Sequence, residues 1–345
     1  MMADPAFGAP RLDAPQPLAE PQLVAKAEAK SEPLIKAGSS HVADEVFRYA
    51  MLACGLCVLA LVGIIIYELA KGSRLSWHAF GLSFFFRSEW DPVNEQFGAL
   101  PFVYGTVVSS LLALLLAVPL ALGVAIFITE MCPRRVKTVL AFSTELLAAI
   151  PSVIYGLWAI FVLVPLLRRF VQPWLARYLG WTGLFEGPPY GIGMLAAGVI
   201  LAIMIVPIIS SITREVMTAV PQQQREAVLA LGATRWEMIR TGVLRNARAG
   251  ILGGVILGFG RALGETMAVT MVIGNRPEIA RSLFAPGYTM ASVIANEFSE
   301  ATTDTYLSAL VEVGLALFLV TIIVNILAQV LVWSVTRGMP ARSNA

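Results

Sequence analysis

Charge is scarce in this sequence of 345 residues. Only 14% of the residues are Asp, Glu, Lys or Arg, whereas soluble globular domains carry about 25%. Hydrophobic residues make up 57%, and they come in long unbroken runs. The formal net charge of +2 is too small to indicate a nucleic-acid partner. These features argue against an ordinary soluble domain and indicate that a lipid bilayer is the solvent for most of the chain.

Histidine and cysteine are rare as well, which leaves few ligands for metal or redox chemistry. The two histidines, His41 and His78, lie outside the apolar runs, so we expect no metal site. Of the three cysteines, Cys54 and Cys57 form a C-x-x-C pair, but it falls inside an apolar run and lacks the βαβ surroundings of a redox motif. An odd number of cysteines also gives no disulfide framework.

Signatures of nucleotide binding and of covalent catalysis are missing too. None of the five lysines follows a glycine, so the chain has no G-x-x-x-x-G-K-[ST] phosphate-binding loop. The G-x-S-x-G and H-E-x-x-H patterns of hydrolases are also absent. We therefore expect a chain that binds no cofactor and catalyses no covalent reaction. If it moves a solute uphill, the energy must come from an ion gradient or from another subunit.

Six apolar runs dominate the rest of the sequence. Each is close to the ~20 residues that an α-helix needs to cross ~30 Å of hydrocarbon. Their hydrophobicity is continuous rather than alternating, which favours helices over a β-barrel. We predict an all-α polytopic membrane protein with six transmembrane helices. The runs cover residues 49–69, 104–129, 142–167, 191–213, 251–274 and 308–333.

The segments outside these runs predict the orientation of the chain. Residues 1–46 are rich in Pro, Ala, Glu and Lys and cannot form a core, so we predict a disordered tail. The first apolar run begins too late for a signal peptide and is expected to be an uncleaved transmembrane helix. Sixteen Lys and Arg residues fall on the side of the bilayer that holds both termini and eight on the other, so both termini are predicted to be cytoplasmic.

The loop between the fourth and fifth runs carries a distinctive pattern. Helix signals run from Pro221 to residue 231, stop at Gly232 and resume at Thr234. A short helix, a glycine and a second helix would form a compact surface element that fits a groove on a partner.

Glu226-Ala227, with Gly232 five residues after the alanine, resembles the EAA loop of ABC-importer permease subunits. The resemblance implies that Glu226, Ala227, Gly232 and Thr234 belong to a coupling helix that docks on a nucleotide-binding ATPase. The usual I-x-L-P ending of that loop is replaced here by Gly-Val-Leu-Arg, which lacks the proline.

The fifth run narrows the family. GILGGVILGFGRALGETMAVTMVIGN, residues 250–275, closely resembles PstC-type permease subunits of bacterial phosphate ABC importers. The similarity extends from about residue 80 to the C-terminal helix and implies the type I ABC importer permease (MetI-like) fold. Three further stretches fit the same family: SEWDP before FGALPFVYGT (residues 88–106), ELLAAIPSVIYGLW (145–158) and GIGMLAAGVILAIMIVP (191–207).

The resemblance also implies a location, an organisation and a set of partners. The chain would lie in the bacterial cell (inner) membrane, form half of a phosphate pore and pair with a homologous PstA-type permease. Two copies of a cytoplasmic ABC ATPase would use the ATP, and an extracytoplasmic phosphate-binding protein would deliver the substrate. The expected organisation is a tail (1–46), the first transmembrane helix with an extracytoplasmic loop (47–103), the permease domain (104–333) and a cytoplasmic C-terminal tail (334–345).

Glycines in the fifth run are spaced for helix packing. A repeat of four residues places small side chains on one helix face, which lets a neighbouring helix backbone approach closely. We expect a packing role for these residues, with some of them at the interface between subunits. The glycines in question are Gly250, Gly254, Gly258, Gly260 and Gly264.

Two charged residues interrupt the same run. Arg261 and Glu265 are four apart, hence on one face of the predicted helix. Leaving either charge unpaired in the bilayer would cost about 2.5–3.5 kcal/mol. By hypothesis, Arg261 faces the translocation path and offers a fork of donors to phosphate oxygens, while Glu265 holds the arginine in place. The alternative is a buried salt bridge that fixes helix register.

Three other polar residues near the runs have simpler interpretations. Glu145 and Glu312 are predicted near helix N-termini, where the macrodipole favours a carboxylate. Asn325 is expected to make an interhelical hydrogen bond.

Three other functions stay open from the sequence. The substrate could be another oxyanion, such as sulfate, molybdate or phosphonate. Composition alone also allows a gradient-driven secondary transporter, although the inverted repeats of such proteins are not evident. A membrane scaffold or sensor subunit without transport is the third possibility.

Overall fold

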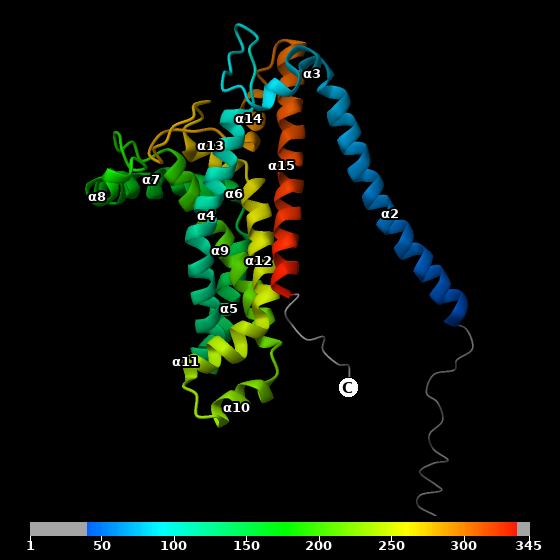
Figure 1. Cartoon of the computed structure of the whole chain (residues 1–345), viewed down its shortest axis with the longest axis vertical. Helices are drawn as coiled ribbons and strands as arrows, with labels where there is room; N and C mark the ends of the chain where they lie inside the picture. Colours follow the sequence, from blue (N-terminus) through cyan, green and yellow to red (C-terminus); the bar gives the residue numbers. More distant parts are fainter. Residues whose placement is uncertain (1–39, 337–345) are drawn as a thin grey trace, which may run out of the picture. The chain divides into compact units, whose positions relative to one another are not determined.

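The computed structural model of this protein describes residues 40–336, and the regular secondary structure in that range is helical apart from two isolated β-bridges (Figure 1). The all-α class predicted from the sequence is confirmed. Residues 1–39, which make up most of the predicted N-terminal tail, lie outside the described residues. So do residues 337–345 of the predicted C-terminal tail.

The chain divides into two units, residues 1–63 and residues 64–345. The described part of the first unit is the beginning of helix α2 (Ser40–Gly72), which is apolar on all sides and exposes Leu52, Val58 and Leu59. A helix that is hydrophobic all round is suited to lipid rather than to water. Helix α2 begins at Ser40, so it starts before the predicted boundary at residue 47.

The core of the second unit is built from long helices that pack through small residues. Helix α4 packs against α9, and α9 packs against α12. Ala113, Ala117 and Ala121 recur every four residues on α4 and are fully buried, so they form a smooth stripe for close packing. Helix α9 is the most buried of the candidate spans. The bounds are α4 (Leu100–Ile126), α9 (Met194–Thr218), α12 (Arg245–Leu263) and α15 (Asp304–Thr336).

The third span differs from its predicted position at 142–167. Helix α5 (Arg134–Ala149) ends before Pro151, and Ile150 and Pro151 are extended, with ψ of 130° and 139°. Proline disfavours helical backbone at the preceding residue, and this separates α5 from the next helix. The apolar stretch that follows runs from Ser152 to Thr182 and projects from the side of the bundle (Figure 1). It comprises α6 (Ser152–Trp158), η3 (Ala159–Leu163), α7 (Val164–Leu166), η4 (Leu167–Val171), α8 (Gln172–Leu179) and η5 (Gly180–Thr182).

The fifth span is bent. Helix α12 ends at Leu263, α13 (Met267–Ile273) follows, and the two axes differ by 63°. Within residues 40–336, five helical stretches are long and apolar enough to cross a membrane, and this bent pair makes a sixth. The number agrees with the six spans predicted from the sequence.

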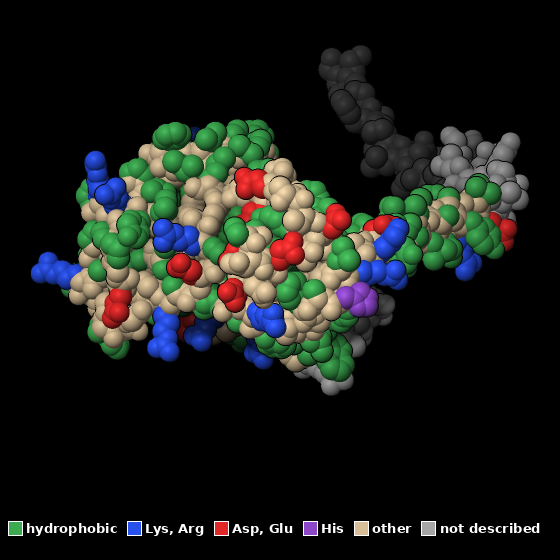
Figure 2. Space-filling model, turned by 90° about the horizontal axis from the view of Figure 1, so that it is seen from above, with side chains coloured by type: hydrophobic (Ala, Val, Ile, Leu, Met, Phe, Trp, Pro, Cys, Tyr) green, Lys and Arg blue, Asp and Glu red, His purple; other side chains and the backbone are tan. Residues whose placement is uncertain are grey.

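The end of the second unit that carries α3 (Arg74–Phe80), η1 (Gly81–Phe85) and α14 (Met290–Glu297) is closed by aromatic residues. The Trp90 Nε1–H and the Tyr306 hydroxyl both donate to Glu297 Oε2, at 2.8 and 2.7 Å. Burial raises the pKa of the neighbouring Tyr288 phenol, so it stays neutral. On the α4 side, Gly105 is so close to Tyr288 that a Cβ would lie 2.0 Å from its carbonyl oxygen. Acidic and basic side chains are interspersed on this face (Figure 2).

Candidate functional site

The loop predicted to dock on a partner forms a defined element at the opposite end of the bundle (Figure 1). Its helices are α10 (Gln222–Ala230) and α11 (Arg235–Glu237), followed by the π-helical turn η6 (Met238–Leu244). Gly232 lies between the two helices with φ of +84°, in the left-handed region that favours glycine. Thr234 caps α11: its Oγ1 accepts from the Glu237 amide, and Glu237 accepts from the Thr234 amide. The predicted helix, glycine and second helix are therefore all present.

The α10–α11 segment (residues 222–237) exposes two large apolar side chains. Leu231 is 88% exposed and Trp236 is 60% exposed, beside the exposed Glu226 and Ala227. Large apolar side chains exposed together outside the spans mark an interaction surface. The sequence pattern pointed to Glu226 and Ala227 but not to Leu231 or Trp236. Their signal is two large apolar residues on either side of the turn at Gly232, Leu231 directly before the glycine and Trp236 four residues after it.

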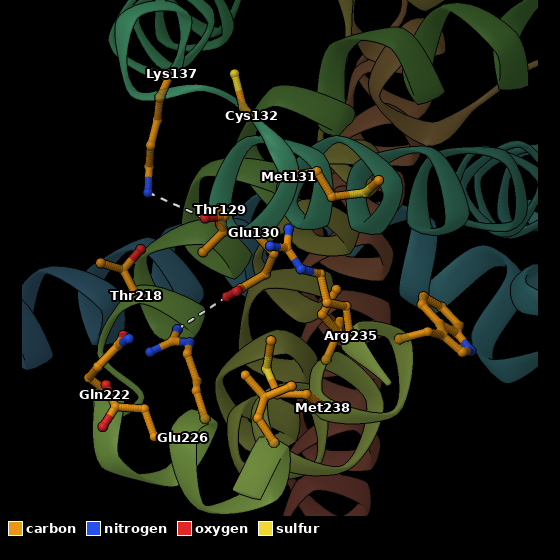
Figure 3. A pocket seen from close by; sticks show the side chains of 14 residues that line it. Thr129, Glu130, Met131, Cys132, Lys137, Thr218, Gln222, Glu226, Arg235 and Met238 are labelled. Carbon is orange, nitrogen blue, oxygen red and sulfur yellow. Dashed lines mark hydrogen bonds and ion pairs between the residues drawn. The ribbon is translucent and has the colours of Figure 1, made fainter. Parts of the chain in front are cut away.

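A cavity of about 1060 Å³ opens beside the segment (Figure 3). It lies between α10, α11, the start of η6, the C-terminal part of α9 and the π-helical turn η2 (Phe127–Met131), which continues α4. Its lining mixes charges of both signs with apolar side chains. The polar part of the lining includes Thr129, Glu130, Lys137, Arg225 and Glu226.

An ion pair lies within the cavity wall. Arg225 Nη2 is 3.2 Å from Glu130 Oε1, and only 13% and 10% of the two side chains are exposed. The same guanidinium donates to the carbonyl oxygens of Met217 (2.8 Å) and Val220 (2.5 Å), at the end of α9. Sequence reasoning missed this pair because its partners are 95 residues apart and neither belongs to a recognisable motif.

The base of the segment rests on an apolar cluster. Ala125, Met217, Ile239 and Val243 are buried together, with other residues of α4, α9 and α12. Val228 of α10 packs over Gly242, where a Cβ would lie 3.3 Å from a Val228 methyl carbon. One face of α10 is thus held by apolar contact with η6, and Arg225 holds it to α9 and η2.

The predicted pair in the fifth span is separated by the bend. Arg261 lies in the last turn of α12 and is exposed, whereas the buried Glu265 lies in the break between α12 and α13. No ion pair joins them, because the helix does not continue past Gly264 and the spacing of four no longer defines one face. Glu265 Oε1 instead faces the Ala268 amide at 3.4 Å, at the start of α13. Within residues 40–336 the Arg261 guanidinium makes no hydrogen bond or ion pair.

The glycines of α12 divide into two groups. A Cβ at Gly250, Gly254 or Gly258 would lie 2.5, 3.1 or 2.7 Å from a side chain of α9. At Gly260 it would meet nothing within 4 Å. Gly264 follows the last residue of α12, with only the Gly260 carbonyl near it, at 3.8 Å. The first three glycines therefore face α9 within the chain, and Gly260 faces outward.

The predicted caps are wrong. Glu145 lies near the C-terminal end of α5, because that helix starts at Arg134, and it pairs with Arg214 of α9. Glu312 lies more than two turns inside α15; it is fully buried and neither carboxylate oxygen has a hydrogen-bond partner in the described structure. Asn325 is exposed, and its side chain makes no hydrogen bond with the described part of the chain.

Comparison with known proteins decides the family. The profile of the family described as "Binding-protein-dependent transport system inner membrane component" matches residues 117–337. This chain belongs to that family. The resemblance to PstC-type permeases noted in the sequence is confirmed by relatives of high identity.

Three named relatives show how far the similarity extends. The "Phosphate transport system permease protein PstC" of Mesorhizobium japonicum is 49% identical over 290 residues, 83% of this chain and 89% of the relative. The protein of the same name from Xylella fastidiosa strain Temecula1 is 45% identical and covers 86% and 92%. The "Probable phosphate transport system permease protein PstC" of Methanocaldococcus jannaschii is 39% identical and covers 72% and 80%.

A solved structure shares the fold of this inner membrane component. A chain of the MetNI methionine ABC transporter superposes with a TM-score of 0.50 at 16% sequence identity, covering 68% of this chain and 94% of the other. At that identity the likeness concerns the fold alone, and it agrees with the predicted type I ABC importer permease architecture. The chain is thus a multi-pass transport component with the fold of an ABC importer permease.

Proposed function

We propose that this chain is a permease subunit of an ATP-driven importer of inorganic phosphate and forms half of its pore. The observation that supports phosphate as the substrate is the high sequence identity to PstC permeases over most of both chains. The chain itself catalyses no covalent reaction and binds no cofactor. ATP is hydrolysed by two copies of a separate cytoplasmic ATPase.

The α10–α11 segment is the proposed docking site for that ATPase. Its surface offers Leu231 and Trp236 for an apolar groove, with the Glu226 carboxylate beside them. The capped turn at Thr234 and the packing of Val228 on Gly242 hold the segment in one shape. A preformed segment loses less conformational entropy on binding than a flexible loop does.

The other partners follow from the predicted orientation, with both termini cytoplasmic. An extracytoplasmic phosphate-binding protein would dock on the end that carries α3 and α14. A homologous PstA-type permease would complete the pore; the apolar stretch from Ser152 to Thr182, which exposes Phe161 and Phe170, offers a surface for it and for lipid. We also propose the order of parts that the sequence predicts, namely a tail, a first transmembrane helix with an extracytoplasmic loop, a permease domain and a C-terminal tail, with boundaries near residues 47, 104 and 334.

Arg261 is the proposed contact for phosphate. Its guanidinium is exposed and makes no hydrogen bond or ion pair with the described chain, and it lies at the bend of the fifth span. A planar fork of donors suits the oxygens of a phosphate. Glu265, buried one residue beyond Gly264, would fix the backbone of the bend rather than neutralise the arginine.

Co-purification from membranes tests the docking proposal. We expect the wild-type chain, extracted in mild detergent, to bring down an ATPase and a second permease. Leu231→Asp should lose the ATPase, because a charge would enter an apolar contact. Val93→Asp is the matched control, since Val93 is 90% exposed on the opposite end of the bundle. Retention of the ATPase by Leu231→Asp would contradict the assigned docking surface.

A further inference from the structure

Arg225 joins three elements that the sequence keeps apart. It belongs to α10, and its partner Glu130 belongs to η2 at the end of α4. One carbonyl acceptor, Met217, lies in the last turn of α9, and the other, Val220, lies two residues beyond that helix. The last carbonyl groups of a helix have no acceptor role within that helix, so a guanidinium there satisfies them. One side chain therefore connects the α10–α11 segment to the ends of two long helices.

The contact is protected from water on one side and borders open space on the other. Both side chains are about nine-tenths buried, so the ion pair is poorly screened and geometrically fixed. Next to the ion pair, the cavity of about 1060 Å³ separates α10 and α11 from η2. The Glu130 carboxylate lies at one end of the dashed line that marks the ion pair (Figure 3). At this cavity the Arg225–Glu130 ion pair is a direct contact between α10 and η2.

The second polar contact of the cavity does not involve α10. Lys137 of α5 donates to the Thr129 carbonyl of η2 at 3.5 Å, which links η2 to α5 only. The apolar cluster at the base of the segment joins α4, α9, η6 and α12, and Val228 of α10 packs against it. Arg225 adds a direct connection from α10, the helix that carries Glu226 and Ala227, to α9 and η2.

We propose that the Arg225–Glu130 ion pair transmits movement of the α10–α11 segment to α4 and α9 during transport. This inference rests on the proposed function, in which an ATPase moves that segment. Arg225 and Glu130 touch neither phosphate nor ATP in this role; they are positioning residues. Without the pair, α10 still docks on the ATPase and follows it, but α4 lags behind.

The test uses the complete transporter in proteoliposomes, with the phosphate-binding protein present. ATP hydrolysis and uptake of labelled phosphate are measured together, and the result is the amount of phosphate moved per ATP. We expect Arg225→Ala and Glu130→Ala to keep the ATPase bound and active but to lower this ratio at least tenfold. Glu130→Gln, which keeps an acceptor oxygen, should lower it less.

A double variant and a matched control separate coupling from general damage. If the two residues act through each other, Arg225→Ala with Glu130→Ala should be no worse than Arg225→Ala alone. Arg214→Ala is the control, because it removes an ion pair between α9 and α5 in which Glu145 is 56% exposed. We expect this variant to keep the wild-type ratio. A purely structural role would reduce hydrolysis and uptake in proportion and leave the ratio unchanged.

The outcomes distinguish this inference from the proposed function. A wild-type ratio in Arg225→Ala and Glu130→Ala overturns the coupling role of the ion pair. If Arg225→Ala does not assemble, a wild-type ratio in Glu130→Gln and Glu130→Ala overturns it equally. A wild-type complex that contains no ATPase, or that does not need one for uptake, contradicts the proposed function itself.

Discussion

Arg225, near the start of α10, and Arg261, in the last turn of α12, lie in opposite surroundings. Arg225 is buried and has three partners, a carboxylate and two carbonyl oxygens. Arg261 is exposed and has none within residues 40–336. A guanidinium that is buried and bonded to several groups inside the chain stabilises a junction, whereas an exposed one with free donors is available to an anion. This difference is the basis of the two proposed roles, transmission of movement for Arg225 and contact with phosphate for Arg261.

The largest expected effect concerns Arg261. We expect Arg261→Ala to lower phosphate uptake about 100-fold, because two charge-assisted hydrogen bonds are together worth about 3 kcal/mol. Arg261→Lys keeps the charge but loses the fork and should retain an intermediate rate. Uptake into membrane vesicles measures both. Normal uptake in Arg261→Lys would remove the argument from fork geometry, and normal uptake in Arg261→Ala would remove the residue from the path.

For the stability of the complex, we expect substitution of Arg225 to have a larger effect than substitution of Arg261. Arg225→Ala leaves Glu130 buried and unpaired, which costs about 3–5 kcal/mol, and the purified complex should unfold at a clearly lower temperature. Arg261→Ala should change the unfolding temperature little, because no hydrogen bond or ion pair in the described chain is lost. Thermal denaturation in detergent measures both variants. Equal shifts for the two arginines would erase the distinction drawn between them.

Two glycines of α12 extend the comparison to packing. Gly258→Ala places a Cβ 2.7 Å from the buried Ile209 side chain and should destabilise the complex by about 1–3 kcal/mol. Gly260→Ala meets nothing within 4 Å and should stabilise the helix by about 0.5–1 kcal/mol. Thermal denaturation of the two variants measures the sign of each stability change. Destabilisation by Gly260→Ala would indicate that this face is covered by another subunit.

The smallest effect is expected at the cap of α11. Thr234→Ala removes the hydroxyl that accepts from the Glu237 amide and should destabilise the turn by about 1 kcal/mol. Thr234→Ser keeps the acceptor and serves as the control. Amide hydrogen exchange over residues 234–240 is the measurement, with faster exchange expected only in the alanine variant. Unchanged exchange in both would show that the cap does not hold the turn.

Much of the fold follows from composition and periodicity. Apolar runs predict six spans because the length of a helix that crosses a bilayer is fixed. The bounds fail where a local break competes with hydrophobicity: Pro151 separates α5 from the third span, and the bend after Leu263 divides the fifth. The same bend separates Arg261 from Glu265, which a spacing of four had placed on one face.

The candidate site was predictable only in part. Glu226, Ala227, Gly232 and Thr234 form a local pattern, so the sequence was enough to find the α10–α11 segment. The Arg225–Glu130 pair depends on how α4 and α9 end next to each other, and a local pattern carries no information about that. Predicting that Glu312 caps a helix failed for a related reason, since the helix start at Asp304 lies outside the apolar run.

The most direct test of the account is the energy source for uptake. Proteoliposomes that contain the complete transporter and the phosphate-binding protein are given either ATP on the side of the α10–α11 segment or an ion gradient without ATP. We predict that labelled phosphate accumulates with ATP alone and that Leu231→Asp abolishes this accumulation. Accumulation driven by the gradient without ATP would contradict the claim that a partner ATPase drives this chain.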